Sequence, residues 1–196
     1  MEVGTIFQRS QLVLDNALLS GDPQQIGDAH SSLAKLHRGF TYSYDSILYH
    51  SDRALSFYLK AGNQLKMAGS YLNLGYAHGN KLSFLSAEEN IMKAIAIYEE
   101  LDIPPQLSGA YGLLSYIFYL SNTYEDAIKY GEQSYSIAKS VQDTANVIEA
   151  LTYLVPAYVE LGQNSLALTK ANECLHWINS YEKHTSVQLM DLYHYR

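Results

Sequence analysis

A repeat with a period of forty residues constrains the fold of this chain more than any other feature of its sequence. Alanines open similar segments at Ala87, Ala127 and Ala167, and each lies 40 residues after the one before. A small residue follows each alanine seven positions later, at Ala94, Ser134 and Cys174. Repeats of about 20–50 residues are typical of solenoids, in which each unit buries its apolar face against its neighbours.

A second pattern with the same period lies upstream of each alanine. Within each unit, apolar or aromatic residues occur at i, i+3 and i+7, which is one face of a helix. The triplets are Tyr71/Leu74/His78, Tyr111/Leu114/Phe118 and Leu151/Leu154/Tyr158. The first unit keeps the pattern as Leu33, Leu36 and Phe40, displaced by two residues, which predicts a turn of different length. Each unit therefore has two helices, which we term A and B in chain order.

Because no segment alternates with period two, we predict an all-α fold, organised as a single solenoid over residues 1–196. A leading B helix is expected at 5–20, helical pairs at 24–61, 64–101, 105–141 and 144–180, and a terminal helix at 184–196. Asp22-Pro23 predicts a capped helix start. Ser86-Ala87-Glu88-Glu89 has capping-box spacing and predicts another start. Ile103-Pro104-Pro105 separates two units.

The small-residue columns have a physical reason. Two helices approach to about 8–10 Å only where the side chains at their crossing are small. We expect such crossings at Ala87, Ala94, Ala127, Ser134 and Ala167.

Composition excludes several classes of protein. With 47% hydrophobic residues, the chain is too apolar to be disordered. Its 13 Lys and Arg against 20 Asp and Glu provide no basic surface for nucleic acid. The most apolar run, Tyr111 to Leu120, is about half of the ~20 residues that a membrane helix needs. A single cysteine and a start without a basic leader suit the cytoplasm.

The sequence contains no recognisable catalytic or metal motif. His30 and His37 are the closest histidines on one predicted helix, and seven residues place them about 10 Å apart along its axis, too far to share a metal. Cys174 lies in a small-residue column and is interpreted as a buried thiol. We therefore predict no enzyme activity, no metal and no cofactor.

These columns resemble the tetratricopeptide repeat (TPR) family. The second unit matches its pattern with Tyr71, Leu74-Gly75, His78, Ala87 and Ala94. The usual TPR unit has 34 residues. A period of forty is similar to the variant found in bacterial regulators and kinesin light chains. The resemblance implies a right-handed superhelical α-solenoid that binds a protein or peptide in a concave groove formed by the A helices.

The resemblance also places the groove positions on particular residues. They are Asn73, Tyr76, Tyr116, Tyr119, Tyr153 and, in the first unit, Arg38; neighbouring positions are Tyr42, Gly112, Leu113, Thr152, Pro156 and Val159. Tyrosine, which occurs 18 times against 5 Phe and 1 Trp, suits binding surfaces because it combines a large rigid area with a hydroxyl group. The alternative is that some of these tyrosines only pack against neighbouring helices.

The resemblance implies a non-catalytic binding module, the sensory or scaffolding part of a larger bacterial signalling or transcription-regulatory protein. The alternative is a self-association module that dimerises through its terminal helices, and a peptide-pheromone receptor is a further variant. The chain ends within an amphipathic stretch that includes Val187, Leu189, Met190, Leu192 and Tyr193. This stretch is expected either to mark a piece of a longer protein or to dock on a partner.

Overall fold

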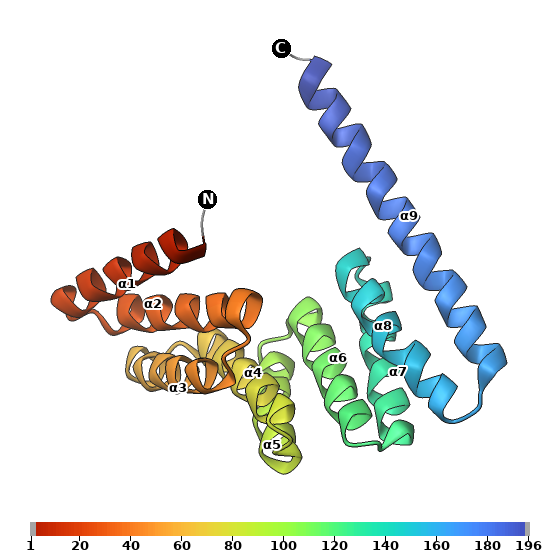
Figure 1. Ribbon diagram of the computed structural model, residues 1–196, viewed down its shortest axis with the longest axis horizontal. Helices are drawn as coiled ribbons and strands as arrows, with labels where there is room; N and C mark the ends of the chain where they lie inside the picture. The colour runs from red at the N-terminus through yellow and green to blue at the C-terminus, as the bar shows by residue number, and fades with distance from the viewer. Residues whose placement is uncertain (1–2, 195–196) are drawn as a thin grey trace. The chain divides into compact units, whose positions relative to one another are not determined.

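The computed structural model describes the backbone of residues 3–194 and the side chains of residues 3–180. Every regular element in this range is helical, which confirms the all-α prediction. The chain forms two compact units, Met1–Ile103 and Pro104–Arg196 (Figure 1). The first contains α1 (Val3–Ser20), α2 (Pro23–Leu36), a π-helical segment (His37–Thr41), α3 (Tyr44–Ala61), α4 (Gln64–Asn80) and α5 (Phe84–Glu100). The second contains α6 (Pro104–Leu120), α7 (Tyr124–Ser140), α8 (Thr144–Glu160) and α9 (Asn164–His194).

The turns between helices repeat every 20 residues. A residue with positive φ lies at 62, 82, 102, 122, 142 and 162, and only the first and last of these are glycines. At each turn the amide of the next residue donates to a carbonyl five residues back, as Ser83 N does to His78 O at 2.9 Å. This is the Schellman closure of a helix C-terminus. The backbone therefore repeats at half the period of the sequence.

Helix starts agree only in part with the sequence predictions. The Asp22 carboxylate accepts from Gln24 N at 2.9 Å and Pro23 opens α2, which confirms that cap. The capping box at Ser86 was wrong. Helix α5 begins at Phe84 with Ser83 as its N-cap, so Ser86 lies inside the first turn. The repeat places the turn by packing, and a local motif two residues later does not move it.

The two-residue displacement expected in the first unit was also wrong. Phe40 is 51% exposed and does not occupy a core column. His30, Leu33 and Ala34 are buried instead, each 40 residues before a buried position of α4. What differs is the π-helical segment, where Tyr42 N donates to His37 O at 2.8 Å before the chain turns into α3.

The predicted small-residue crossings are buried. Ala87, Ala94 and Ala127 are 0% exposed, Ser134 is 1% exposed and Ala167 is 4% exposed. A Cβ added to Gly75 of α4 would lie 2.5 Å from Ile91 Cγ1 of α5, and one added to Gly131 of α7 would lie 2.7 Å from Leu154 Cδ2 of α8. Such close approach explains why these columns carry no larger side chain.

Each unit has its own apolar core. In the first, Leu14 and Ala17 of α1 pack with Ile26, Ala29 and Leu33 of α2. In the second, the core of α7, α8 and α9 consists of Tyr135, Ala138, Val147, Ala150, Leu151, Leu154, Tyr158 and Ala167. Within the described residues, no helix combines the length and apolar character needed to cross a membrane.

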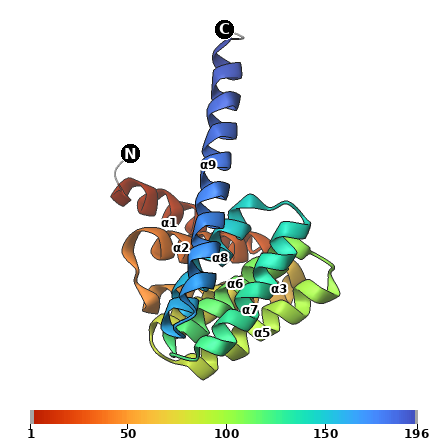
Figure 2. The same cartoon turned by 90° about the vertical axis from the view of Figure 1, so that its right-hand side faces the viewer.

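A separate terminal helix from about residue 184 was expected, and the structure differs. Helix α9 is continuous from Asn164 to His194 (Figure 1 and Figure 2). The repeat would place a turn at Glu182, but Tyr181-Glu182-Lys183 contains no glycine or proline to end a helix. The other non-glycine turns are closed by a following helix that packs back on the pair, whereas the described part of α9 packs only on α8.

Candidate peptide-binding surface

The side chains predicted to bind a ligand divide between the two units. Arg38 of the π-helical segment and Asn73 and Tyr76 of α4 belong to the first unit. Tyr116 and Tyr119 of α6 and Tyr153 of α8 belong to the second. In the second unit, α6 and α8 are A helices that contact each other. Their side chains can therefore form one surface.

An aromatic pair lies where α6 meets α8. The ring centroids of Tyr116 and Tyr153 are 5.3 Å apart, and the ring planes are inclined by 36°. Both side chains are half-buried, so part of each ring stays accessible. The Tyr153 hydroxyl donates to Glu149 Oε1 at 3.2 Å, one turn earlier on the same helix. Packing thus holds the rings in place, which lowers the entropy lost when a ligand binds.

Tyr119 belongs to a different aromatic pair. Its ring centroid is 5.8 Å from that of Tyr124, the first residue of α7. The Tyr124 hydroxyl donates to Asn122 Oδ1 at 2.9 Å in the α6–α7 turn. The structure therefore pairs Tyr116 with Tyr153, and it pairs Tyr119 with the turn.

In the first unit, a cation–π contact joins Arg38 to Tyr76. The guanidinium carbon lies 4.2 Å from the Tyr76 ring centroid, and the Tyr44 ring lies 6.2 Å away in an edge-on arrangement. Burial raises the pKa of the Tyr76 hydroxyl above its ordinary value, although the neighbouring Arg38 acts in the opposite direction. Arg38 therefore occupies a site beside Tyr76, but through the π turn and not through the displaced register on which the prediction relied.

Asn73 is placed differently from the other predicted residues. It is only 5% exposed, so little of its side chain is available to a ligand. The neighbouring positions Gly112 and Leu113 are also buried, whereas Tyr42 is 61% exposed. Its repeat column therefore faces the helix pair as much as the surface, a distinction that the sequence pattern did not make.

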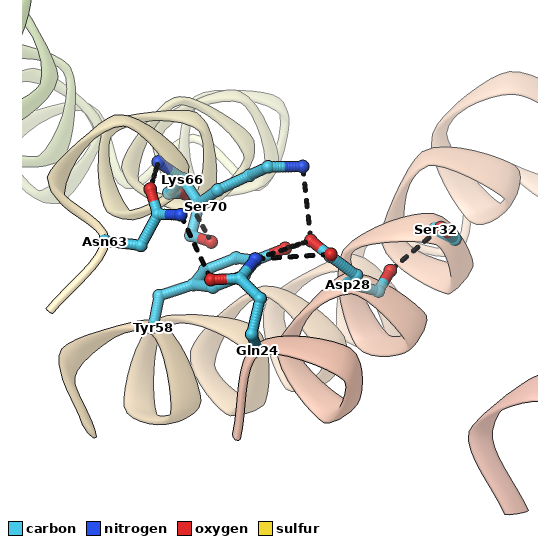
Figure 3. Close-up of polar contacts among 7 residues, drawn as sticks. All are labelled: Gln24, Asp28, Ser32, Tyr58, Asn63, Lys66 and Ser70. Carbon is cyan, nitrogen blue, oxygen red and sulfur yellow. Dashed lines mark hydrogen bonds and ion pairs between the residues drawn. The ribbon is translucent and has the colours of Figure 1, made fainter. Parts of the chain in front are cut away.

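Many of the remaining tyrosines bind carboxylates inside the repeat. The Tyr58 hydroxyl of α3 donates to Asp28 Oδ1 of α2 at 2.8 Å, and Lys66 Nζ of α4 lies 3.2 Å from the same oxygen (Figure 3). Gln24 and Asn63 complete the cluster, since Gln24 donates to Asp28 and Asn63 Nδ2 donates to Gln24 Oε1 at 3.0 Å (Figure 3). This cluster ties three successive helices together.

The second unit repeats this arrangement twice. The Tyr158 hydroxyl donates to Glu132 Oε1 at 2.8 Å, and Lys170 Nζ lies 2.7 Å from that oxygen. Tyr135 donates to Glu173, which also pairs with Lys139 at 3.2 Å. Burial, helped by the hydrogen bond to Glu132, raises the pKa of Tyr158 to about 12. Tyr158, predicted to be a packing residue, is 7% exposed and confirmed in that role.

Sequence reasoning missed a histidine cluster in the first unit. His50 Nδ1 of α3 lies 3.0 Å from His30 Nδ1 of α2. The His37 ring stacks on His50 with centroids 5.6 Å apart, and Phe7 of α1 packs on His37 at 4.9 Å. Burial lowers the pKa of His50 from 6.5 to about 4, and the adjacent His30 and His37 lower it further. His30 and His37 were examined as a pair on one helix, so a third histidine from α3 had no signal in the sequence.

These histidines do not form a metal site. Among the described residues, no three His, Cys, Asp or Glu side chains are grouped so that they could hold a metal ion. Cys174 of α9 is half-buried, and burial raises the pKa of its thiol. A raised thiol pKa disfavours the thiolate that a nucleophile requires.

Comparison with solved structures assigns the fold. The chain is similar to the TPR-like repeats of a putative kinesin light chain from Podosopora anserina, with a TM-score of 0.70 and 13% identity over 92% of this chain and 90% of that chain. It is also similar to the apo form of RapI, with a TM-score of 0.81 and 10% identity over 93% of this chain and 66% of that chain. The resemblance to TPR proteins is therefore confirmed at the level of fold.

A further similar structure contains a ligand. It is a Rap protein complexed with Competence and Sporulation Factor, with a TM-score of 0.70 and 12% identity over 86% of this chain and 44% of that chain. The present chain thus spans only part of both Rap proteins. No protein-family model matches the sequence, and no curated protein matches it either.

Proposed function

We propose that this chain is a non-catalytic module that binds a peptide or protein segment on the tyrosine-lined surface of its A helices. The observation that carries the proposal is the Tyr116–Tyr153 pair, held at 5.3 Å between α6 and α8 with part of each ring accessible. Aromatic side chains fixed by their neighbours are typical of residues that dominate binding energy. The Rap structure with a bound factor supports a peptide-sized ligand for this fold.

The same proposal gives the chain a place in a larger protein. It is the sensory or scaffolding part of a bacterial signalling or transcription-regulatory protein. The support for this role is the similarity to two Rap structures, of which this chain spans 66% and 44%. The cytoplasm is the proposed location, on the grounds of the single cysteine and the acidic composition.

The test is selection of ligands from a random peptide library displayed on phage, followed by affinity measurement with the selected peptides. Fluorescence anisotropy would compare the wild type with Tyr116→Ala and Tyr153→Ala. We expect each substitution to weaken binding by about 10- to 30-fold, since a hot-spot aromatic contributes about 2 kcal/mol. Tyr49→Ala on the B helix α3, where Tyr49 is 59% exposed, is the matched control and should leave affinity unchanged.

Two outcomes would reject the proposal. One is a library that yields no peptide above background. The other is a peptide whose affinity depends on Tyr49 as strongly as on Tyr116. A Tyr116→Ala variant that unfolds would show that this ring is a packing residue, and circular dichroism would detect it.

Self-association is the second candidate function. Helix α1 carries exposed apolar side chains, with Leu12 60%, Val13 57%, Leu18 51% and Leu19 86% exposed. Apolar patches of this kind often mark protein contacts. Sedimentation velocity across a range of concentrations tests this candidate, because a monomer throughout would eliminate it. If dimers form, Leu19→Lys should dissociate them.

A further inference from the structure

A cavity opens between α8 and α9 in the second unit. Its volume is about 370 Å³, and its lining is Leu151, Thr152, Val155, Pro156, Ala171, Cys174 and Leu175. No lining residue is charged, and Thr152 is the one that carries a hydroxyl group. Cavities of this size and character bind apolar groups.

The repeat identifies what such a surface holds. Subtracting 40 from the lining residues gives positions on α6 and α7: Tyr111, Gly112, Ser115, Tyr116, Gly131, Ser134 and Tyr135. This earlier surface receives α8. Leu154 of α8 packs against Gly131, and the Tyr153 ring packs against Tyr116. The cavity between α8 and α9 therefore continues, one repeat further, the interface by which α6 and α7 hold an A helix.

Within residues 3–194 no A-type helix follows onto this surface. Helix α9 runs on as one helix to His194 (Figure 1). As a result, Leu175 at the rim of the cavity is 57% exposed and Leu168, one heptad earlier, is 64% exposed. Leu151, on the floor, is 0% exposed, so the floor is already part of the core.

The C-terminal segment of this chain, in its own or a second copy, fits the cavity poorly. In the forty-residue register, Asp191 and His194 would take the places of Leu151 and Leu154. Both of those leucines are 0% exposed. A carboxylate buried at such a position without a partner is strongly unfavourable.

We propose that the cavity binds an amphipathic helix of a partner protein, at a site separate from the tyrosine-lined surface. The docking helix presents uncharged apolar residues at i, i+4 and i+7, as α8 does with Val147, Leu151 and Leu154. Its residue at the Leu154 position is shorter than leucine. A Cβ on Gly131 would lie 2.7 Å from Leu154, and Ala171 carries that Cβ at the equivalent place.

Cys174 offers a direct readout because it is the single cysteine of the chain and lines the cavity. The probe is a synthetic peptide with the sequence of residues 144–160 carrying Leu154→Ala and Pro156→Ala, the second change because proline breaks an isolated helix. Alkylation of Cys174 by N-ethylmaleimide would be measured in the intact protein with and without the peptide. We expect saturating peptide to slow alkylation about tenfold, because the docked helix covers the thiol.

Paired variants give the specificity. Leu175→Lys, at the exposed rim, should weaken peptide binding by about tenfold or more, because its ammonium group would be buried by the docked helix. Leu166→Lys is the matched control, since Leu166 is 45% exposed and lies nine residues away on the opposite side of α9. A control peptide that also carries Leu151→Asp should not protect Cys174.

The proposal is overturned if the probe peptide leaves the alkylation rate of Cys174 unchanged, or if it protects Cys174 equally in the Leu175→Lys variant. It is also overturned if the protein forms a dimer that Leu175→Lys dissociates, because the cavity would then belong to a second copy. Protection that is lost with Leu175→Lys and kept with Leu166→Lys supports it.

Discussion

The histidine cluster of the first unit predicts a specific loss of stability in acid. His50 lies between His30, 3.0 Å away through their Nδ1 atoms, and the stacked ring of His37. The Nδ1 contact requires one nitrogen to donate and the other to accept, so it cannot persist when both rings are doubly protonated. Arg53 of α3 adds a positive charge that further disfavours protonation of His30.

The sign follows from proton linkage. The pKa of His50 is lowered from 6.5 to about 4, so between these values the unfolded chain binds the proton and the folded one does not. Stability from this group is fully present above pH 6.5, falls as the pH drops toward 4, and is then level. The burial that lowers the pKa of His30 and His37 gives both the same sign.

The magnitude can be bounded. At about 1.36 kcal/mol per pH unit, the interval from 6.5 to about 4 allows at most about 3 kcal/mol. His50 is half-buried, so solvent screening reduces this to about 1–2 kcal/mol. Part of the effect is shared with His30, because the two rings titrate as a coupled pair.

The assay is urea unfolding followed by circular dichroism at pH values from 7.5 to 4.0. His50→Asn is the informative variant, because its amide can occupy the Nδ1 position without titrating in this range. We expect the wild type to lose about 1–2 kcal/mol more than His50→Asn between pH 6.5 and pH 4. His176→Asn, on exposed α9, is the control and should behave as the wild type. Equal acid sensitivity in the wild type and His50→Asn would refute the reasoning.

Two further predictions concern the backbone of the repeat, and unfolding midpoints in urea check both. Gly75→Ala should destabilise by about 1–3 kcal/mol, because its Cβ would lie 2.5 Å from Ile91 Cγ1. Gly69→Ala in the same helix meets nothing within 4 Å and should stabilise by about 0.5–1 kcal/mol; equal effects of the two would contradict the crossing. Leu82→Gly should be neutral to stabilising, because Leu82 has a φ of 61° and is 70% exposed. Leu85→Gly, 72% exposed inside α5, should cost about 1 kcal/mol, and the reverse order would show that the turn stores no strain.

The candidate surface was predictable only in part. Tyrosines at the groove positions were correctly found on the A helices, but their partners were not. The sequence contains no sign that Tyr116 meets Tyr153 while Tyr119 meets Tyr124, since both pairings depend on how helices cross. Asn73 shows the same gap, because a column that is polar in sequence is 5% exposed in the fold.

The sequence by itself determined the all-α class, the helical pairs and the small-residue crossings. Periodicity and residue size are properties of the chain, and Ala87 or Ala127 can be recognised without coordinates. Tertiary structure alone decided the turns at Leu82, Asp102 and Gln142, which carry no glycine yet adopt positive φ because the next helix packs back on the pair. It also placed His50 between His30 and His37, and it let α9 run to His194. Contacts between segments 20 or more residues apart arise from packing, and a local pattern does not encode them.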